Sequence, residues 1–181
     1  MILASSSPQR SAQLERLGVE FEVRAPRVEE VTEGPPDRVA LTNALAKARS
    51  VADGRARVIG CDTIVALDGR IYGKPADESE ARATLAALSG RTHEVLSGLA
   101  LIDDAGEHAE IARTRVTFRT IDEPLMDWFI ARGEWRERSG AYAIQGGAAA
   151  FARAIDGDFE NIVGLPVALV IDRWPDLLTA P

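Results

Sequence analysis

Apolar residues recur at two different periods along this chain, and each period predicts one type of element. Leu41, Ala44, Leu45 and Ala48 follow the 3.6-residue spacing of an amphipathic helix, which we expect over residues 37–52. Short apolar runs between turn residues predict strands. On these grounds we expect strands at residues 1–4, 21–24, 58–61, 64–67, 94–102, 107–118 and 151–155, and further helices at 8–17, 78–88, 123–132 and from 166 onward.

Local signals mark where several of these elements begin or turn. Ser7 followed by Pro8 is typical of a helix start, with the serine as the N-cap. Asp77 with Glu80 resembles a capping box, and Asp68-Gly69 is a strong hairpin signal. Strands and helices alternate except at two hairpins. The pattern therefore predicts an α/β fold with a mixed β-sheet and flanking helices.

Length and composition favour one folded domain over residues 1–181, because about 100–200 residues make a domain. The chain is 46% hydrophobic and 27% charged, and no apolar run approaches the roughly 20 residues of a membrane span. We expect no secretory signal at the N-terminus. The single cysteine, Cys61, excludes an internal disulfide framework and favours a reducing cytoplasm.

The charge balance disfavours a general nucleic-acid binder. The formal net charge is −7, so DNA or RNA would be repelled on average. A small phosphorylated ligand needs only a local cluster of cations and N–H groups, and net charge does not exclude it. Two histidines, His93 and His108, leave little for a His/Cys metal site.

The serine-rich loop before the first helix is a candidate anion site. Residues 5–8 lead into a helix N-terminus, where free N–H groups and the positive end of the helix dipole favour an anion. Arg10 in the first turn opposes that dipole unless it shares an anion with the loop. The alternative from local sequence is an ordinary capped helix.

Charged residues elsewhere offer candidate chemistry. Asp62 interrupts an apolar strand pattern, and a buried carboxylate there is costly unless a metal, a cation or hydrogen bonds compensate it. Lys47 lies beside the apolar stripe of its helix, and Lys74 lies in a stiffened Gly-Lys-Pro turn. Glu29 and Glu30 stand in a loop. Each has a plain alternative: a capping aspartate, lysines on the surface and a solvated acidic pair.

The remaining motifs carry weaker signals. Gln145 lies in a glycine-rich segment, and its amide both donates and accepts, which suits a base edge. Residues 161–166, NIVGLP, indicate a loop that ends where Pro166 starts a helix. His93 falls in an alternating strand and is expected to be structural, and Cys61 is expected to be a small buried residue.

The order of these motifs resembles the Maf family of nucleoside triphosphate pyrophosphatases, also called septum-formation inhibitor proteins. The resemblance covers about residues 2–175 and rests on the whole series rather than on one motif. In chain order the motifs are SSSPQR, VEE, Lys47-Ala48-Arg49, GCDTIV, GKP, GRTHEV, VTFR, GAYAIQG and NIVGLP.

The resemblance implies two lobes with a cleft between them, and often a homodimer. It implies cleavage of a nucleotide between its α and β phosphates with Mg²⁺ or Mn²⁺. Asp62 matches the catalytic aspartate, which is also a candidate metal ligand together with Glu30. The residues that match the phosphate-binding loop and the cations around the triphosphate are Ser7, Arg10, Lys47 and Lys74.

Three positions distinguish the branches of the family. Thr63 and Gln145 match the branch that acts on dTTP and UTP, whereas Gln9 stands where that branch usually has arginine. We therefore expect a pyrimidine nucleotide as substrate. The alternatives are a pyrophosphatase for methylated GTP or another modified nucleotide, and a nucleotide-binding regulator of cell division without turnover.

Overall fold

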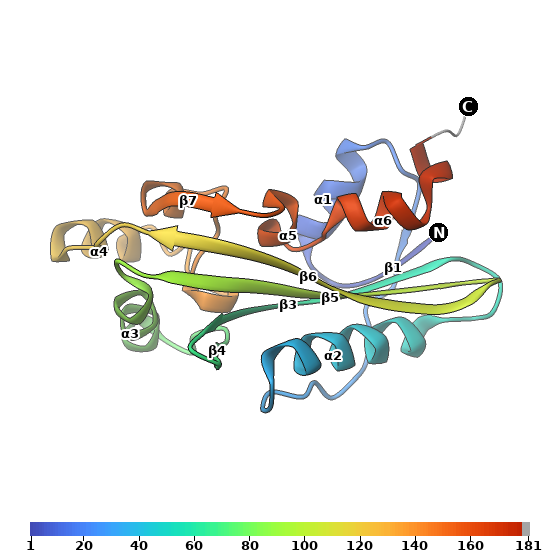
Figure 1. The fold of residues 1–181 in the computed structure, drawn as a ribbon, viewed down its shortest axis with the longest axis horizontal. Helices are drawn as coiled ribbons and strands as arrows, with labels where there is room; N and C mark the ends of the chain where they lie inside the picture. The colour runs from blue at the N-terminus through green and yellow to red at the C-terminus, as the bar shows by residue number, and fades with distance from the viewer. Residues whose placement is uncertain (179–181) are drawn as a thin grey trace.

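The computed structural model describes residues 1–178 and consists of a mixed β-sheet with helices on both faces (Figure 1). The expected fold class is confirmed, and the last three residues of the predicted domain lie outside the described ones. The strands are β1 (Ile2–Ala4), β2 (Glu22–Val23), β3 (Val58–Leu67), β4 (Arg70–Tyr72), β5 (Thr92–Asp103), β6 (Gly106–Phe118) and β7 (Ala152–Asp156). The α-helices are α1 (Pro8–Arg16), α2 (Pro36–Val51), α3 (Glu78–Leu88), α4 (Glu123–Ala131), α5 (Phe159–Val163) and α6 (Val167–Arg173), with short 3-10 turns at Ser139–Ala141, Gly147–Ala150 and Pro175–Leu178.

Three long strands, β3, β5 and β6, form the middle of the sheet and span most of its length (Figure 1). The order across the sheet is β2-β1-β3-β5-β6-β7, and β4 also pairs with β3. β1 is parallel to both of its neighbours, and every other pair is antiparallel. The two hairpins predicted from the sequence join β3 to β4 and β5 to β6.

One edge of β3 carries a notch between two shorter strands. β1 pairs with β3 only as far as Ala4 opposite Gly60, and β4 begins to pair at Tyr72 opposite Val65. In the described chain, residues 61–64 therefore have no strand on that edge. Only this edge of β3 is interrupted, because β5 pairs with β3 along the other edge.

The prediction of two separate strands around Asp62 was wrong. β3 runs unbroken through this residue, because β5 pairs with it along the other edge and places Gly98 opposite Asp62. Side chains alternate between the faces of a strand. Asp62 therefore shares the α2 face with Gly60, whereas Cys61 and Thr63 face α1 and α6.

The core is divided between the two ends of the sheet, in agreement with the expected two lobes. At one end, side chains from α3, α4 and the 3-10 turns surround Phe118, Phe129 and Phe151. At the other end, α1 and α6 cover one face and α2 covers the opposite face. The notch in β3 lies where these two parts meet.

Glycines on β3 and β5 allow α2 to pack directly against the sheet. A Cβ atom at Gly98 would lie 2.2 Å from the carbonyl oxygen of Ala40, and one at Gly60 would lie 2.4 Å from that of Ala44. Because both neighbours are helix backbone, neither contact can be relieved by a side-chain rotation. These two glycines therefore allow α2 to lie close to β3 and β5.

We predict that Gly98→Ala destabilises the protein by about 1–3 kcal/mol, the usual cost of overpacking a core. Gly73→Ala is a matched control, because a Cβ there meets no atom within 4 Å and the backbone is not left-handed. Urea unfolding of both variants measures the difference. Equal stability of Gly98→Ala and the unmodified protein would contradict this account of the packing.

Two local predictions need correction. Ser7 is the N-cap residue of α1, but its side chain makes no capping bond; its Oγ donates to Gln9 Oε1 at 3.1 Å instead. Residues 161–163 are helical rather than loop, because Asp158 caps the short helix α5 through the N–H of Glu160. The predicted cap at Asp77 is confirmed, since its carboxylate accepts from the N–H of Glu80 at 2.9 Å.

Candidate active site

A cleft of about 900 Å³ opens at the notch in β3. It is bounded by the β1–α1 loop, the loop before α2, the open edge of β3, the turn after β4 and the segment 137–145. All the candidate residues line it, although they come from distant parts of the sequence. They are Ser7, Gln9, Arg10, Glu30, Lys47, Asp62, Thr63, Lys74 and Gln145.

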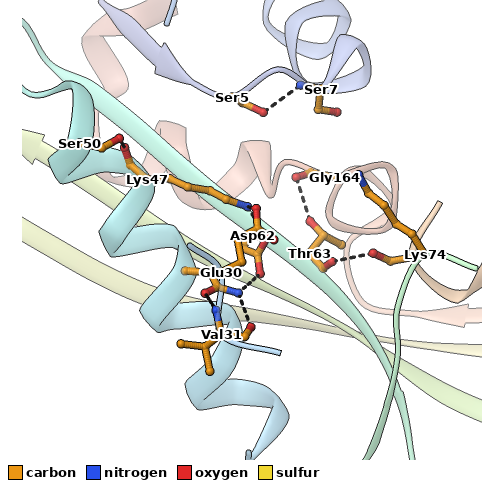
Figure 2. Close-up of polar contacts among 12 residues, drawn as sticks. Ser5, Ser7, Glu30, Val31, Lys47, Ser50, Asp62, Thr63, Lys74 and Gly164 are labelled. Carbon is orange, nitrogen blue, oxygen red and sulfur yellow. Dashed lines mark hydrogen bonds and ion pairs between the residues drawn. The ribbon is translucent and has the colours of Figure 1, made fainter. Parts of the chain in front are cut away.

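Asp62 is held by two donors from α2 (Figure 2). Its Oδ1 accepts from Lys47 Nζ at 2.6 Å, and its Oδ2 accepts from Asn43 Nδ2 at 3.0 Å. The side chains of Asp62 and Lys47 are only 12% and 9% exposed. A carboxylate so placed would be costly alone, and these two contacts compensate it. The cation and the hydrogen bond that a buried carboxylate at this position requires are therefore both present.

Lys47 joins two carboxylates across the cleft. Its Nζ contacts Glu30 Oε1 at 2.8 Å in addition to Asp62, and the Glu30 side chain is half exposed. One ammonium group thus draws a buried carboxylate and a solvent-facing carboxylate to the same point (Figure 2). Glu29 and Glu30 are both exposed, but Glu30 lines the cleft and Glu29 does not.

Asn43 was missed by the sequence analysis. Its Nδ2 donates to the carbonyl oxygen of Val31 at 2.9 Å as well as to Asp62, and its Oδ1 accepts from the N–H of Val31 at 2.8 Å. The amide therefore ties the loop that carries Glu30 to the buried carboxylate. A signal was present, because Asn43 lies four residues before Lys47 and so shares its helix face.

Arg10 connects three segments on the other side of the notch. Its Nε donates to the carbonyl oxygen of Gly164 at 2.7 Å, and its terminal nitrogens donate to Ser5 Oγ at 3.1 Å and to Thr63 Oγ1 at 3.0 Å. The side chain is buried. Three of the five N–H donors are used in this way, and two remain for a ligand.

The β1–α1 loop keeps the features of an anion site. The hydroxyl of Ser5 accepts from the backbone N–H of Ser7 at 3.1 Å, which shapes the turn into α1 (Figure 2). Because no side chain caps the first turn of α1, its N–H groups stay available to a bound anion.

Lys74 and Gln145 lie on another wall of the cleft. Lys74 Nζ is exposed and contacts Glu137 Oε2 at 3.2 Å. The N–H of Gly140 donates to the carbonyl oxygen of Gly73 at 3.1 Å, so the turn with Lys74 is joined to the segment that leads to Gln145. The Gln145 side chain is exposed within the cleft lining.

Cys61 and His93 are both buried and contact other protein groups, as expected for residues with a structural role. Cys61 is fully buried, its Sγ contacts the carbonyl oxygen of Gly164 at 3.2 Å, and burial raises the pKa of the thiol. Burial lowers the pKa of His93 to about 4, so the ring is neutral near pH 7. Its Nε2 lies 2.8 Å from Tyr142 Oη, within a cluster of aromatic rings.

The donor set at the notch suits a hard divalent cation that also binds substrate. Glu30 and Asp62 both contact the ammonium of Lys47, so their carboxylates lie close together, and Mg²⁺ is commonly held by one or two carboxylates together with substrate phosphates. Residues 1–178 contain no group of three or more His, Cys, Asp or Glu side chains arranged to hold a metal by themselves. A cation here would need oxygens from the ligand.

No helix within residues 1–178 is long and apolar enough to cross a membrane.

Known proteins of similar sequence are nucleotide pyrophosphatases by name, which agrees with a cleft that can bind phosphates. The family model described as Maf-like protein matches residues 1–174. A dTTP/UTP pyrophosphatase of Symbiobacterium thermophilum is 44% identical over 171 residues, covering 92% of this chain and 88% of that protein. Proteins of the same name from Pelotomaculum thermopropionicum and Deinococcus radiodurans are 42% and 44% identical, covering 95% and 94% of this chain and 93% and 89% of their own lengths. The chain therefore belongs to the Maf family.

Proposed function

We propose that this protein is a nucleoside triphosphate pyrophosphatase that cleaves dTTP and UTP to the monophosphate and pyrophosphate. The observation that carries the proposal is the cleft at the β3 notch, which is lined by the buried Asp62, by its partner Lys47 and by the uncapped N-terminus of α1. The relatives named dTTP/UTP pyrophosphatase, at 42–44% identity over nearly the full chain, support the substrate class.

Hydrolysis of a phosphate anhydride is slow because anionic oxygens repel the attacking water and because charge builds on the leaving group. We propose that Asp62 orients the water and accepts its proton at a carboxylate oxygen. Lys47 and Asn43 hold that carboxylate in place. Arg10 and Lys74 neutralise the phosphates, and the uncapped N–H groups in the first turn of α1 donate hydrogen bonds to them.

A divalent cation, Mg²⁺ or Mn²⁺, is the proposed cofactor. Glu30 and Asp62 would hold it, together with substrate phosphates, and when bound it would neutralise phosphate charge at the reacting centre. The closeness of these two carboxylates, which both contact Lys47, supports this assignment. We also propose that the protein acts in the cytoplasm, consistent with its single buried cysteine, and that it forms a homodimer, as the family resemblance implies.

The runner-up function is a pyrophosphatase for methylated GTP, and Gln9 is the observation that favours it. Gln9 replaces the arginine that is usual in the pyrimidine branch, and its amide is held by the hydroxyl of Ser7. Rates of pyrophosphate release from dTTP, UTP, CTP, GTP and methylated GTP distinguish the two functions. A preference for methylated GTP of tenfold or more in kcat/KM, about 1.4 kcal/mol, would contradict the pyrimidine assignment.

We predict that Gln145→Glu removes the preference for dTTP and UTP while Gln9→Arg keeps or increases it. An amide both donates to and accepts from the edge of uracil or thymine, whereas a carboxylate cannot donate to a carbonyl. A site built on such pairing rejects a base that leaves its groups unpaired. The measurement is kcat/KM across the same five nucleotides, and an unchanged ranking in Gln145→Glu would place this residue away from the base.

A further inference from the structure

A fourth cation lines the cleft, and one of its buried donors has no hydrogen-bond partner among residues 1–178. Arg138 lies between Glu137 and Ser139, on the wall that also carries Lys74. Its Nε is buried and has no hydrogen-bond partner among residues 1–178. An unpaired buried donor costs free energy, and native structures contain few of them. The Nε of Arg138 is therefore a buried donor for which residues 1–178 supply no acceptor.

The other three cations of the cleft are already engaged. Lys47 contacts Asp62 at 2.6 Å and Glu30 at 2.8 Å. Arg10 donates three hydrogen bonds to protein oxygens. Lys74 contacts Glu137 at 3.2 Å. A phosphate that recruits Lys47 or Lys74 competes with their carboxylate partners, and Arg10 has two N–H donors left, whereas no hydrogen bond within residues 1–178 uses the Nε of Arg138.

The acidic residues next to Arg138 in sequence are occupied by other partners. Glu137 contacts Lys74. Glu134 accepts from the backbone N–H of Gly147 at 2.6 Å and pairs with Arg132 at 2.5 Å. Arg138 lies near enough to Glu134 to help lower the pKa of that carboxyl, but Glu134 gives its Nε no hydrogen bond, so a ligand in the cleft can supply the acceptor.

We propose that Arg138 is a substrate-binding residue that holds anionic oxygens of the triphosphate tail, an inference that rests on the proposed function. A guanidinium presents a planar pair of donors that matches phosphate geometry. The bond from the N–H of Gly140 to the carbonyl oxygen of Gly73 joins the segment of Arg138 to the turn of Lys74. Arg138 and Lys74 thus form a second group of cations, separate from Arg10 and Lys47, for the departing pyrophosphate.

The test compares Arg138→Gln with Arg138→Lys, and uses Arg153→Gln as a control for loss of one positive charge. Arg153 is exposed on β7, outside the cleft lining. We expect Arg138→Gln to raise KM for dTTP and UTP alike by about 10- to 100-fold, the worth of a hydrogen bond to a charged group. Arg138→Lys restores part of the loss, because it keeps the charge without the planar pair of donors. Arg153→Gln leaves KM unchanged.

Calorimetry measures the affinity of the unmodified protein and of Arg138→Gln for inorganic pyrophosphate and for dTMP. These affinities test the role of Arg138 without requiring turnover. If Arg138 binds the phosphate tail, Arg138→Gln weakens pyrophosphate binding about as much as it raises KM, while dTMP binding changes little. Equal weakening for dTMP and pyrophosphate, a loss that follows the base, or no loss at all would overturn the proposal. An unmodified protein that hydrolyses no nucleotide would refute the proposed function, yet its pyrophosphate affinity would still decide the role of Arg138.

Discussion

Asp62→Asn is expected to reduce kcat by at least about 10²–10⁴-fold, the usual contribution of a general base. The substitution keeps the shape of the side chain and removes both its charge and its basicity. Loss of a metal-binding oxygen adds to the effect if the cation binds as proposed. Steady-state assays with dTTP under saturating Mg²⁺ measure the change.

The folded state of Asp62→Asn should persist, because Lys47 retains Glu30 as a partner at 2.8 Å and β3 keeps its pairing with β5. Asp104→Asn, in the exposed turn between β5 and β6, is the control for removing one carboxylate. A thermal melt establishes that both variants are folded. Near-normal turnover by folded Asp62→Asn would refute the mechanism.

Lys47→Met is expected to cost about 3–5 kcal/mol of stability, because it leaves the buried carboxylate of Asp62 without its cation. It should also abolish turnover of every nucleotide, because the reaction of each one depends on the Asp62 carboxylate that Lys47 holds in place. Arg49→Met is the matched control on the same helix. Its ion pair with Glu107 is exposed and is worth at most about 1 kcal/mol.

The double variant Lys47→Met with Asp62→Asn distinguishes the two effects of Lys47. Removing the carboxylate as well leaves no uncompensated buried charge, so the double variant should be more stable than Lys47→Met alone. It should remain inactive. Additive losses of stability, measured by urea unfolding, would show that the contact of 2.6 Å between these two side chains does not couple them.

The sequence predicted most of the fold because its signals are local. The helix at residues 37–52 follows from apolar spacing, and the structure places it at Pro36–Val51. The cap at Asp77 and the hairpin at Asp68-Gly69 require only neighbouring residues. Continuity of β3 could not be predicted in this way, because the pairing that carries the strand through Asp62 comes from β5, more than thirty residues away.

For the candidate site, too, the residues could be predicted from the sequence but their long-range contacts could not. The family resemblance supplied its nine residues, and the structure brings them into one cleft. The contacts that hold them were not predictable, because each depends on a partner distant in sequence. Arg10 reaches Gly164, and Asn43 connects Val31 to Asp62. The unbonded Nε of Arg138 could not be predicted either, because it is recognised only from the contacts of the folded chain.

We propose that, among the two phosphorus atoms joined by the cleaved anhydride bond, water attacks the α-phosphorus of a nucleotide bound at the β3 notch. Hydrolysis of dTTP in ¹⁸O-labelled water, followed by mass analysis of both products, tests this directly. The account predicts one labelled oxygen in dTMP and none in pyrophosphate. Label in the pyrophosphate, or release of dTDP and orthophosphate, would contradict it.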